Sequence, residues 1–391
     1  MSIKNLLEDE YYIYGFGLSG KWLSTMLGKK VIGFIDSDEK KTGRVFNEIT
    51  TFSPKTLGDI SGKPIIVAVV DIQDVLPTIS NLFPNSEVIP MGKLLNNQKA
   101  GKGIDGESEE FVDYSLRAVE ICHRSFLENE NPRFMRSLDI VISTRCSLKC
   151  QDCSNLMQYY KNPNNITFED VAEYFTKLMN RIDHIYEVRI IGGEPFMNKE
   201  AYEIINFFLD HNGVSKVVVY TNATIPLKPE KMKGFDDKKL VFFVTDYGSL
   251  SKNTERLTNM LADMGVAFSA FTPRNWTDSG RIVHHKRSIE ANQEIFEKCC
   301  GKNLYTIMES KLYRCPFAAN ADRLSGIPKN PLNFVDVNSP TDEITQYLYG
   351  KNFIPACDYC MGRSFDAPEI VPAIQTDKPL EYKEFSDNKA V

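Results

Sequence analysis

The sequence predicts an α/β protein built on parallel sheets. Short apolar runs that read as buried strands, such as residues 138–143 and 214–220, alternate with segments of helical spacing. Repeated β/α units of this kind form parallel sheets with right-handed crossovers. Cysteines and polar residues directly follow several of the apolar runs. They are therefore expected at strand carboxyl ends, where α/β folds place their chemistry.

The composition is that of a globular protein, with 42% hydrophobic and 25% charged residues among 391. The net charge is 46 − 52 = −6 without a basic cluster, which argues against nucleic-acid binding. No apolar run reaches the ~18 residues of a membrane span, and the acidic N-terminus is unlike a signal peptide. Nine cysteines in such a chain favour a cytoplasmic protein with metal or redox chemistry over a disulfide framework.

The length allows several domains. Composition shifts along the chain divide it into a nucleotide- or substrate-binding domain at 1–98, a Gly-rich charged linker with a helix at 99–135, a central domain at 136–290, a cysteine-rich hairpin domain at 291–375 and a polar tail at 376–391.

The first domain carries a glycine-rich turn between an expected strand and an expected helix. The strand at 11–14 is followed by Gly15, Gly17 and Gly20, and the next strand ends at Asp36. Glycines permit a tight turn and the close approach of a phosphate to a helix N-terminus, and the acid can accept hydrogen bonds from ribose hydroxyls. The pattern predicts a small Rossmann-like sheet.

Three interpretations of this domain stay open. It binds NAD, although the unit is small for a full dinucleotide fold; it binds a nucleotide or nucleotide-sugar; or it is a docking domain without a ligand. Residues 33–43 resemble the N-terminal domain of sugar acetyltransferases, which binds UDP-linked sugars. That resemblance favours the nucleotide-sugar interpretation.

The central domain begins with a cysteine motif. Cys146, Cys150 and Cys153 follow the expected strand at 138–143 with C-x3-C-x2-C spacing. Three soft thiolates can hold three irons of a [4Fe–4S] cluster and leave the fourth iron open to a small molecule. The alternatives are a structural zinc site, which usually has four ligands in paired C-x2-C turns, or three unrelated thiols.

Two further motifs follow apolar runs in the same order as in a known family. They are Ile191-Gly-Gly-Glu-Pro195 and Tyr220-Thr-Asn222. Together with the cysteine motif they resemble the radical SAM superfamily, which implies a partial (β/α)6 TIM-like barrel. One departure is Asp152, which stands where the family usually has an aromatic residue that seats adenine.

The resemblance also implies the chemistry. Members cleave S-adenosylmethionine reductively to methionine and a 5′-deoxyadenosyl radical, which abstracts hydrogen from a substrate, with flavodoxin or ferredoxin as electron donor. The residues expected to bind S-adenosylmethionine are Gly192, Gly193, Glu194, Asn222 and, at the end of a later strand, Asp246. For Asp246 a substrate contact or a plain turn is equally open.

Five more cysteines lie in the C-terminal region. An expected hairpin at 304–314 leads to Cys315, and Cys357 and Cys360 form a C-x2-C turn. Spacing alone permits zinc or an iron–sulfur cluster. The radical SAM resemblance favours one auxiliary [4Fe–4S] cluster in a SPASM- or twitch-like extension. We expect Cys300 as its fourth ligand and Cys299 as a free thiol, a candidate hydrogen-atom donor.

The sequence thus predicts a radical SAM enzyme that acts on a nucleotide-linked or phosphorylated sugar or polyol in glycan or small-molecule biosynthesis. The net reaction, whether lyase, isomerase or oxidoreductase, stays open. One alternative is a radical SAM enzyme of peptide maturation, although such enzymes often carry a winged-helix domain at the N-terminus. The other is a non-catalytic iron–sulfur scaffold or electron-transfer protein, which would not need the Gly-Gly-Glu motif.

Overall fold

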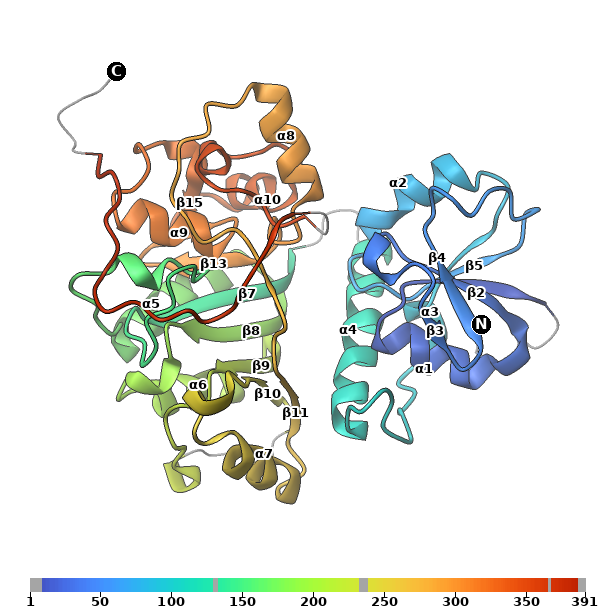
Figure 1. The fold of residues 1–391 in the computed structure, drawn as a ribbon, viewed down its shortest axis with the longest axis horizontal. Helices are drawn as coiled ribbons and strands as arrows, with labels where there is room; N and C mark the ends of the chain where they lie inside the picture. Colours follow the sequence, from blue (N-terminus) through green and yellow to red (C-terminus); the bar gives the residue numbers. More distant parts are fainter. Residues whose placement is uncertain (1–8, 129–132, 232–237, 365–366, 386–391) are drawn as a thin grey trace. The chain divides into compact units, whose positions relative to one another are not determined.

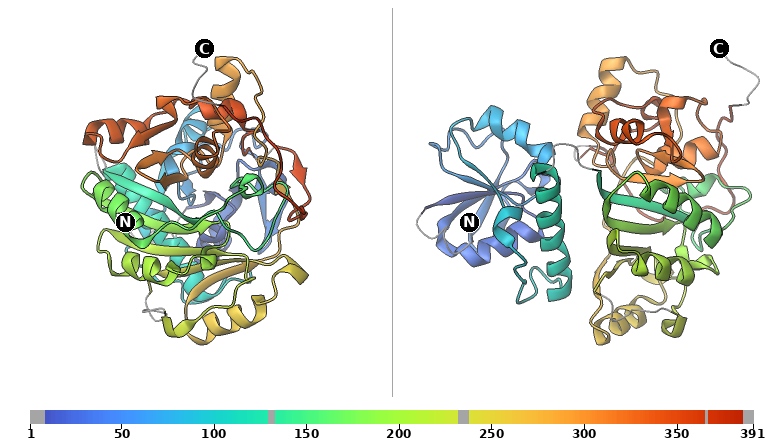
Figure 2. Two further views of the ribbon diagram at one scale, coloured as in Figure 1. Left: turned by 90° about the vertical axis from the view of Figure 1, so that its left-hand side faces the viewer. Right: turned by 180° about the vertical axis from the view of Figure 1, so that it is seen from behind.

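The computed structural model describes residues 9–128, 133–231, 238–364 and 367–385, and the chain divides into two compact units at 1–132 and 133–391 (Figure 1). Each unit is built on a sheet with a parallel core, so the expected α/β class is confirmed. Two further views are shown in Figure 2. In the part of the chain that is described, no helix is long and apolar enough to cross a membrane.

The first unit contains a six-stranded sheet. Its strands, in spatial order, are β3 (Val45–Phe46), β4 (Ile49–Phe52), β2 (Val31–Ile35), β1 (Tyr11–Tyr14), β5 (Ile65–Val67) and β6 (Val88–Pro90). All neighbours are parallel except β3 and β4, which form a hairpin. The strands at 11–14 and 31–35 lie where the apolar runs predicted them.

Helices cover both faces of this sheet. The helices are α1 (Leu18–Leu27), α3 (Gly92–Leu95) and α4 (Glu109–Glu128) on one face and α2 (Ile72–Leu82) on the other. Trp22 of α1 and Val119 of α4 share one apolar core with Phe34 of β2, whereas Ile79 of α2 packs with Ile35 on the opposite face. The expected helix after the linker therefore lies within the first unit.

The second unit contains an eight-stranded sheet. In spatial order the strands are β11 (Ala267–Phe271), β10 (Leu240–Thr245), β9 (Val214–Thr221), β8 (His184–Gly192), β7 (Phe134–Ser143), β13 (Tyr305–Met308), β14 (Lys311–Tyr313) and β15 (Phe334–Asp336). The six strands from β11 to β13 are parallel, and β14 and β15 are antiparallel additions. The arrangement is consistent with a partial barrel. Among the described residues its edge strands, β11 and β15, do not pair with each other.

Alternation along the strands gives this sheet two different faces. One face packs under α5 (Phe168–Met179), α6 (Ala201–Asp210), α7 (Thr254–Asp263) and α10 (Thr341–Tyr349) (Figure 1). Ile140 of β7 points into that core with Phe175 and Phe208, whereas its neighbour Val141 packs on the opposite face with Phe317 of α9 (Pro316–Arg323). Successive strand residues point to opposite faces, so the apolar runs are buried on both sides.

The C-terminal residues return to the second unit in two ways. The expected hairpin forms as β13 and β14, but β13 also pairs with β7, so it extends the main sheet. Further on, β16 (Glu369–Ile370) pairs with β12 (Trp276–Thr277), and a backbone bridge then joins Gln375 to Cys150. We call residues 369–376 the strap.

Candidate functional site

The cysteine loop begins where β7 ends, at Ser143. Its three thiols lie in a small apolar cluster with Leu148 of the loop, and other segments complete the cluster with Ala373, Leu250, Tyr247 and Trp276. Burial, with a smaller contribution from the neighbouring cysteines, raises the pKa of the Cys146 thiol and raises that of Cys150 to about 11. A metal centre that supplies positive charge would favour the thiolate form of such thiols.

The three thiols fit an iron–sulfur cluster. No three His, Cys, Asp or Glu side chains in the described ranges surround a point where a single metal ion would sit. That finding does not bear on a cluster, because each thiolate of a [4Fe–4S] cube binds a different iron and the sulfur atoms stay well apart. The donor set is soft, partly buried and close to side-chain N–H donors, which is the environment that such clusters require.

The end of β8 lies directly against the cysteine loop. The backbone N–H of Gly193 donates to the carbonyl oxygen of Ser143 and that of Glu194 donates to Arg145, both at 2.9 Å. A Cβ atom on Gly193 would lie 2.3 Å from the Arg145 oxygen and 2.7 Å from the Cβ of Cys146. Only glycine therefore permits this approach, which explains the glycines of the motif in terms of this chain's own packing.

Glu194 is fully buried and joins the ends of β8 and β9. Its two carboxylate oxygens accept hydrogen bonds from the Thr221 hydroxyl at 3.0 Å and from the Asn222 backbone N–H at 2.9 Å. Burial raises the pKa of Glu194 to about 7, and the donated hydrogen bonds oppose that rise. In this structure the Glu194 side chain positions two strand ends.

Asn222 and Asp246 lie at the ends of the next two strands. The Asn222 side-chain N–H₂ lies 3.6 Å from the Cys146 Sγ, within reach of a hydrogen bond to sulfur. The Asp246 carboxylate accepts from the Gly248 N–H at 2.9 Å and so shapes a turn. Its neighbour Tyr247 contacts the cysteine cluster and packs edge-on against Trp276, 5.8 Å between ring centroids.

Asp152 forms an ion pair with Arg281. Its carboxylate accepts from Arg281 Nε at 2.5 Å and from the Gln151 amide at 2.8 Å. Next to Arg281, a Cβ on Gly280 would lie 2.5 Å from the Asp152 carbonyl oxygen. The segment at 280–281 is thus held against the cysteine loop at Asp152, the position where the sequence departs from the expected aromatic residue.

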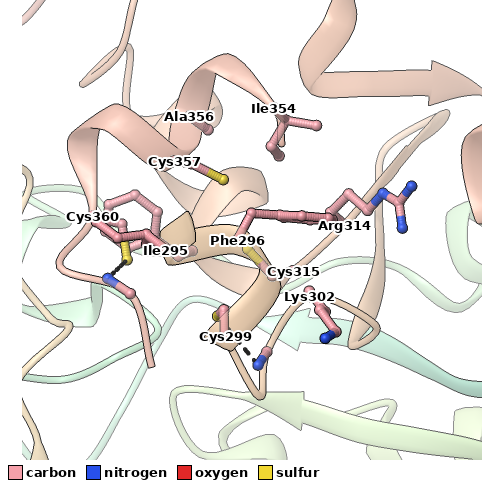
Figure 3. Close-up of a pocket in the computed structure, with 13 residues that line it drawn as sticks. Ile295, Phe296, Cys299, Lys302, Arg314, Cys315, Ile354, Ala356, Cys357 and Cys360 are labelled. Carbon is pink, nitrogen blue, oxygen red and sulfur yellow. Dashed lines mark hydrogen bonds between the residues drawn. The ribbon is translucent and has the colours of Figure 1, made fainter. Parts of the chain in front are cut away.

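A second group of thiols lines one pocket in the C-terminal region (Figure 3). The pocket is formed by Cys299, Cys315, Cys357 and Cys360 together with Phe296 and Arg314. Cys299 follows α8 (Ile289–Lys298), and Cys315 precedes α9, where its sulfur accepts from the Ala318 N–H at 3.5 Å. Burial raises the pKa of Cys315 to about 11 and of Cys357 to about 12, and in each case nearby thiols contribute.

Cys300 is not among the lining residues of this pocket. Its side chain is exposed, and its backbone N–H donates to the Arg363 carbonyl oxygen at 2.9 Å. Cys299 faces the pocket instead, and its sulfur accepts from the Gly301 N–H at 3.3 Å (Figure 3). The structure therefore groups Cys299, and not Cys300, with the other three thiols.

In the first unit the glycine-rich turn forms between β1 and α1. Gly15 has φ +115°, and a Cβ on Gly20 would lie 2.0 Å from the Gly15 carbonyl oxygen, so both positions are restricted to glycine by the turn itself. Gly17 is different, because its Cβ position has no heavy atom within 4 Å. That open space lies at the first turn of α1.

Asp36 is engaged by its own chain. One carboxylate oxygen accepts from the Phe16 N–H at 2.8 Å and from Lys41 Nζ at 3.0 Å, and the other accepts from the Asp38 N–H at 2.9 Å. The buried carboxylate therefore connects the glycine-rich turn to the segment after β2, and these bonds account for an acidic residue at this strand end without a ligand.

Comparisons with known proteins agree with the geometry at the second unit. Residues 140–263 match the family model described as the Radical SAM superfamily, and this stretch contains the cysteine loop and the ends of β8 and β9. A curated relative, GTP 3′,8-cyclase of Aquifex aeolicus (strain VF5), is 26% identical over 140 residues, which cover 35% of this chain and 42% of the relative. The match thus spans less than half of that relative. These matches support an enzyme of the radical SAM class.

Solved structures with detectable likeness include BtrN in complex with AdoMet and 2-DOIA, with a TM-score of 0.38, 13% identity and coverage of 56% of this chain and 83% of that chain. For native anSMEcpe with bound AdoMet and Cp18Cys peptide, the TM-score is 0.38 and the identity is 15%, with coverage of 56% of this chain and 82% of that chain. For Streptococcus suis SuiB bound to S-adenosylmethionine, the TM-score is 0.30 and the identity is 16%, with coverage of 46% of this chain and 42% of that chain. Likeness at this level identifies no substrate.

The adjacent cysteines provide a matched test of the second thiol group. After anaerobic reconstitution with iron and sulfide, we expect Cys299→Ala to lose about half of the bound iron, because it removes a thiol of the pocket. Cys300→Ala is the control and should keep the iron content of the wild type. Iron and sulfide analysis per chain gives the result, and iron loss in Cys300→Ala alone would contradict the assignment.

Proposed function

We propose that this radical SAM enzyme binds a reducing [4Fe–4S] cluster and S-adenosylmethionine at the carboxyl edge of β7, β8 and β9. The observation that carries the proposal is the contact of the Gly193 backbone with the cysteine loop, which brings a three-thiol set and a glycine-rich strand end together. When bound, the cluster supplies the electron that cleaves S-adenosylmethionine to a 5′-deoxyadenosyl radical.

Each group of residues at this edge has a separate proposed role. Cys146, Cys150 and Cys153 hold three irons of the cluster. The backbone at Gly192 and Gly193 packs directly against the cysteine loop. The methionyl group is proposed to bind beside this contact, and Glu194 keeps that backbone in register with β9. Asn222, Tyr247 and Asp246 lie at the adjoining strand ends, where the nucleoside half of the cofactor is expected.

The second thiol group is proposed to hold an auxiliary [4Fe–4S] cluster, with Cys299, Cys315, Cys357 and Cys360 as ligands. Two observations support this assignment. The four cysteines line the same pocket, and in Cys315, Cys357 and Cys360 nearby thiols contribute to the raised pKa. Cys300 is left as the free thiol, so the role of candidate hydrogen-atom donor passes to it from Cys299.

The substrate proposed is a nucleotide-linked or phosphorylated sugar or polyol. Its support is the glycine-rich turn of the first unit, where Gly17 leaves open space at the first turn of α1 and the N-cap residue provides no side-chain hydrogen bond. A phosphate would meet the backbone N–H groups of that turn. Asp36 does not add to that support, because both of its oxygens already accept hydrogen bonds within the chain.

Reductive cleavage is tested on the reconstituted protein under anaerobic conditions. With dithionite and S-adenosylmethionine, the wild type is expected to form 5′-deoxyadenosine, measured by liquid chromatography. Cys146→Ala should reduce its formation at least about 100-fold, because cluster chemistry needs all three thiolates. The control Cys122→Ala, on α4, should retain activity. Fully iron-loaded wild type that forms no 5′-deoxyadenosine would favour an iron–sulfur scaffold.

The substrate class is tested by binding to the full chain. UDP-glucose at saturation should raise the thermal midpoint of the wild type, since a ligand that binds only the folded state stabilises it by about 2.7 kcal/mol at 100 times its Kd. Gly17→Phe should abolish the shift because it fills the open space, whereas Gly17→Ala should largely keep it. No shift with UDP-glucose, UDP or glucose phosphate in the wild type would count against this substrate class.

A further inference from the structure

The strap lies edge to edge with the cysteine loop. The backbone N–H of Gln151 donates to the carbonyl oxygen of Ile374, and the N–H of Thr376 donates to that of Lys149, both at 2.8 Å. An antiparallel bridge pairs Cys150 with Gln375 between these bonds. Main-chain pairing therefore places Gln375 directly opposite the middle cysteine, although the two residues are 225 positions apart.

The side chain of Gln375 has only one orientation that satisfies its neighbours. Its Oε1 accepts from the Lys149 backbone N–H at 2.7 Å, and an N–H needs an oxygen there. Its Nε2 donates to the Ala373 carbonyl oxygen at 2.7 Å, which needs a donor. The same Nε2 lies 3.3 Å from the Cys150 Sγ. Because both ends of the amide are fixed independently, the second N–H must be directed at the sulfur.

This contact differs from the other polar contacts of the three thiols. Cys146 accepts from the Leu148 N–H at 3.4 Å and has the Asn222 amide at 3.6 Å, and these donors come from the loop itself and from β9. Among the hydrogen bonds that described residues donate to these thiols, the one from Gln375 comes from the C-terminal segment. The strap also brings Ala373 into the apolar cluster around Cys150, which is 9% exposed.

A hydrogen bond to a cluster thiolate has a known electrostatic effect. It draws negative charge from the sulfur and stabilises the reduced, more negative cluster, which raises the reduction potential. It also fixes the side-chain rotamer of the ligand.

We propose that Gln375 is a positioning residue for the radical-generating cluster: it orients Cys150 and donates a hydrogen bond to its thiolate, which makes the strap part of the cluster site. The inference rests on the proposed function in one respect, namely that Cys150 is a cluster ligand. It adds a residue outside the stretch at 140–263 that matches the family model.

The test compares two substitutions in the strap. Gln375→Leu removes the donor with little change in volume. Thr376→Val is the matched control, because it loses only a side-chain contact to the Lys149 carbonyl oxygen at 3.2 Å and keeps its backbone hydrogen bond. Both variants and the wild type are reconstituted anaerobically, checked for folding by circular dichroism, and analysed for iron. The potential is measured by EPR-monitored redox titration of the signal that Cys150→Ala lacks.

Gln375→Leu is expected to have a more negative cluster potential than the wild type, and Thr376→Val an unchanged one. Gln375→Glu should shift the potential further in the same direction, because a carboxylate cannot donate and adds negative charge. Iron loss confined to folded Gln375→Leu would also support the positioning role. An intact cluster with an unchanged potential in Gln375→Leu would overturn the inference while leaving the proposed function in place. A wild type that binds no cluster would overturn both.

Discussion

The buried carboxylate of Glu194 is the contact on which the rest of the site depends. It is 0% exposed, and its oxygens accept from the hydroxyl of Thr221 and the backbone of Asn222, so direct hydrogen bonds hold the ends of β8 and β9 together. A buried carboxylate without such donors would be strongly destabilising. Both oxygens of Glu194 are occupied by hydrogen bonds, so this side chain fixes the end of β8. The preceding residue, Gly193, contacts the cysteine loop.

Segments from distant parts of the second unit meet around this edge. The cysteine loop is bordered on one side by the ends of β8 and β9, on a second by the segment at 280–281 through the Asp152–Arg281 ion pair, and on a third by the strap. Because each contact is made by backbone groups or charged pairs, the loop has few ways to relax when the thiols carry no metal. Such preorganisation lowers the cost of placing three thiolates for one cluster.

The sequence predicted the parts of this site that have local signals. Apolar runs located β7, β8 and β9, and the cysteine and Gly-Gly-Glu motifs follow them directly. The strap has no such signal, since residues 369–376 show neither clear alternation nor helical spacing, and their pairing with Cys150 is purely tertiary. Which of Cys299 and Cys300 joins the other pocket thiols depends on the backbone conformation after the last residue of α8. The spacing of the cysteines in the sequence does not specify that conformation. Asp36 matched a nucleotide-binding pattern, yet its partners Phe16 and Lys41 became visible only in the fold.

The central claim is that the thiols at the end of β7 and the strand ends held by Glu194 form one site for a cluster and S-adenosylmethionine. The most direct test is the EPR spectrum of the dithionite-reduced, reconstituted protein before and after S-adenosylmethionine is added. Binding at the open iron is expected to change the g-values of the signal that depends on Cys150, and S-adenosylhomocysteine added to the same reduced protein serves as a control for nonspecific effects. A signal that S-adenosylmethionine leaves unchanged at saturating concentration would contradict the account.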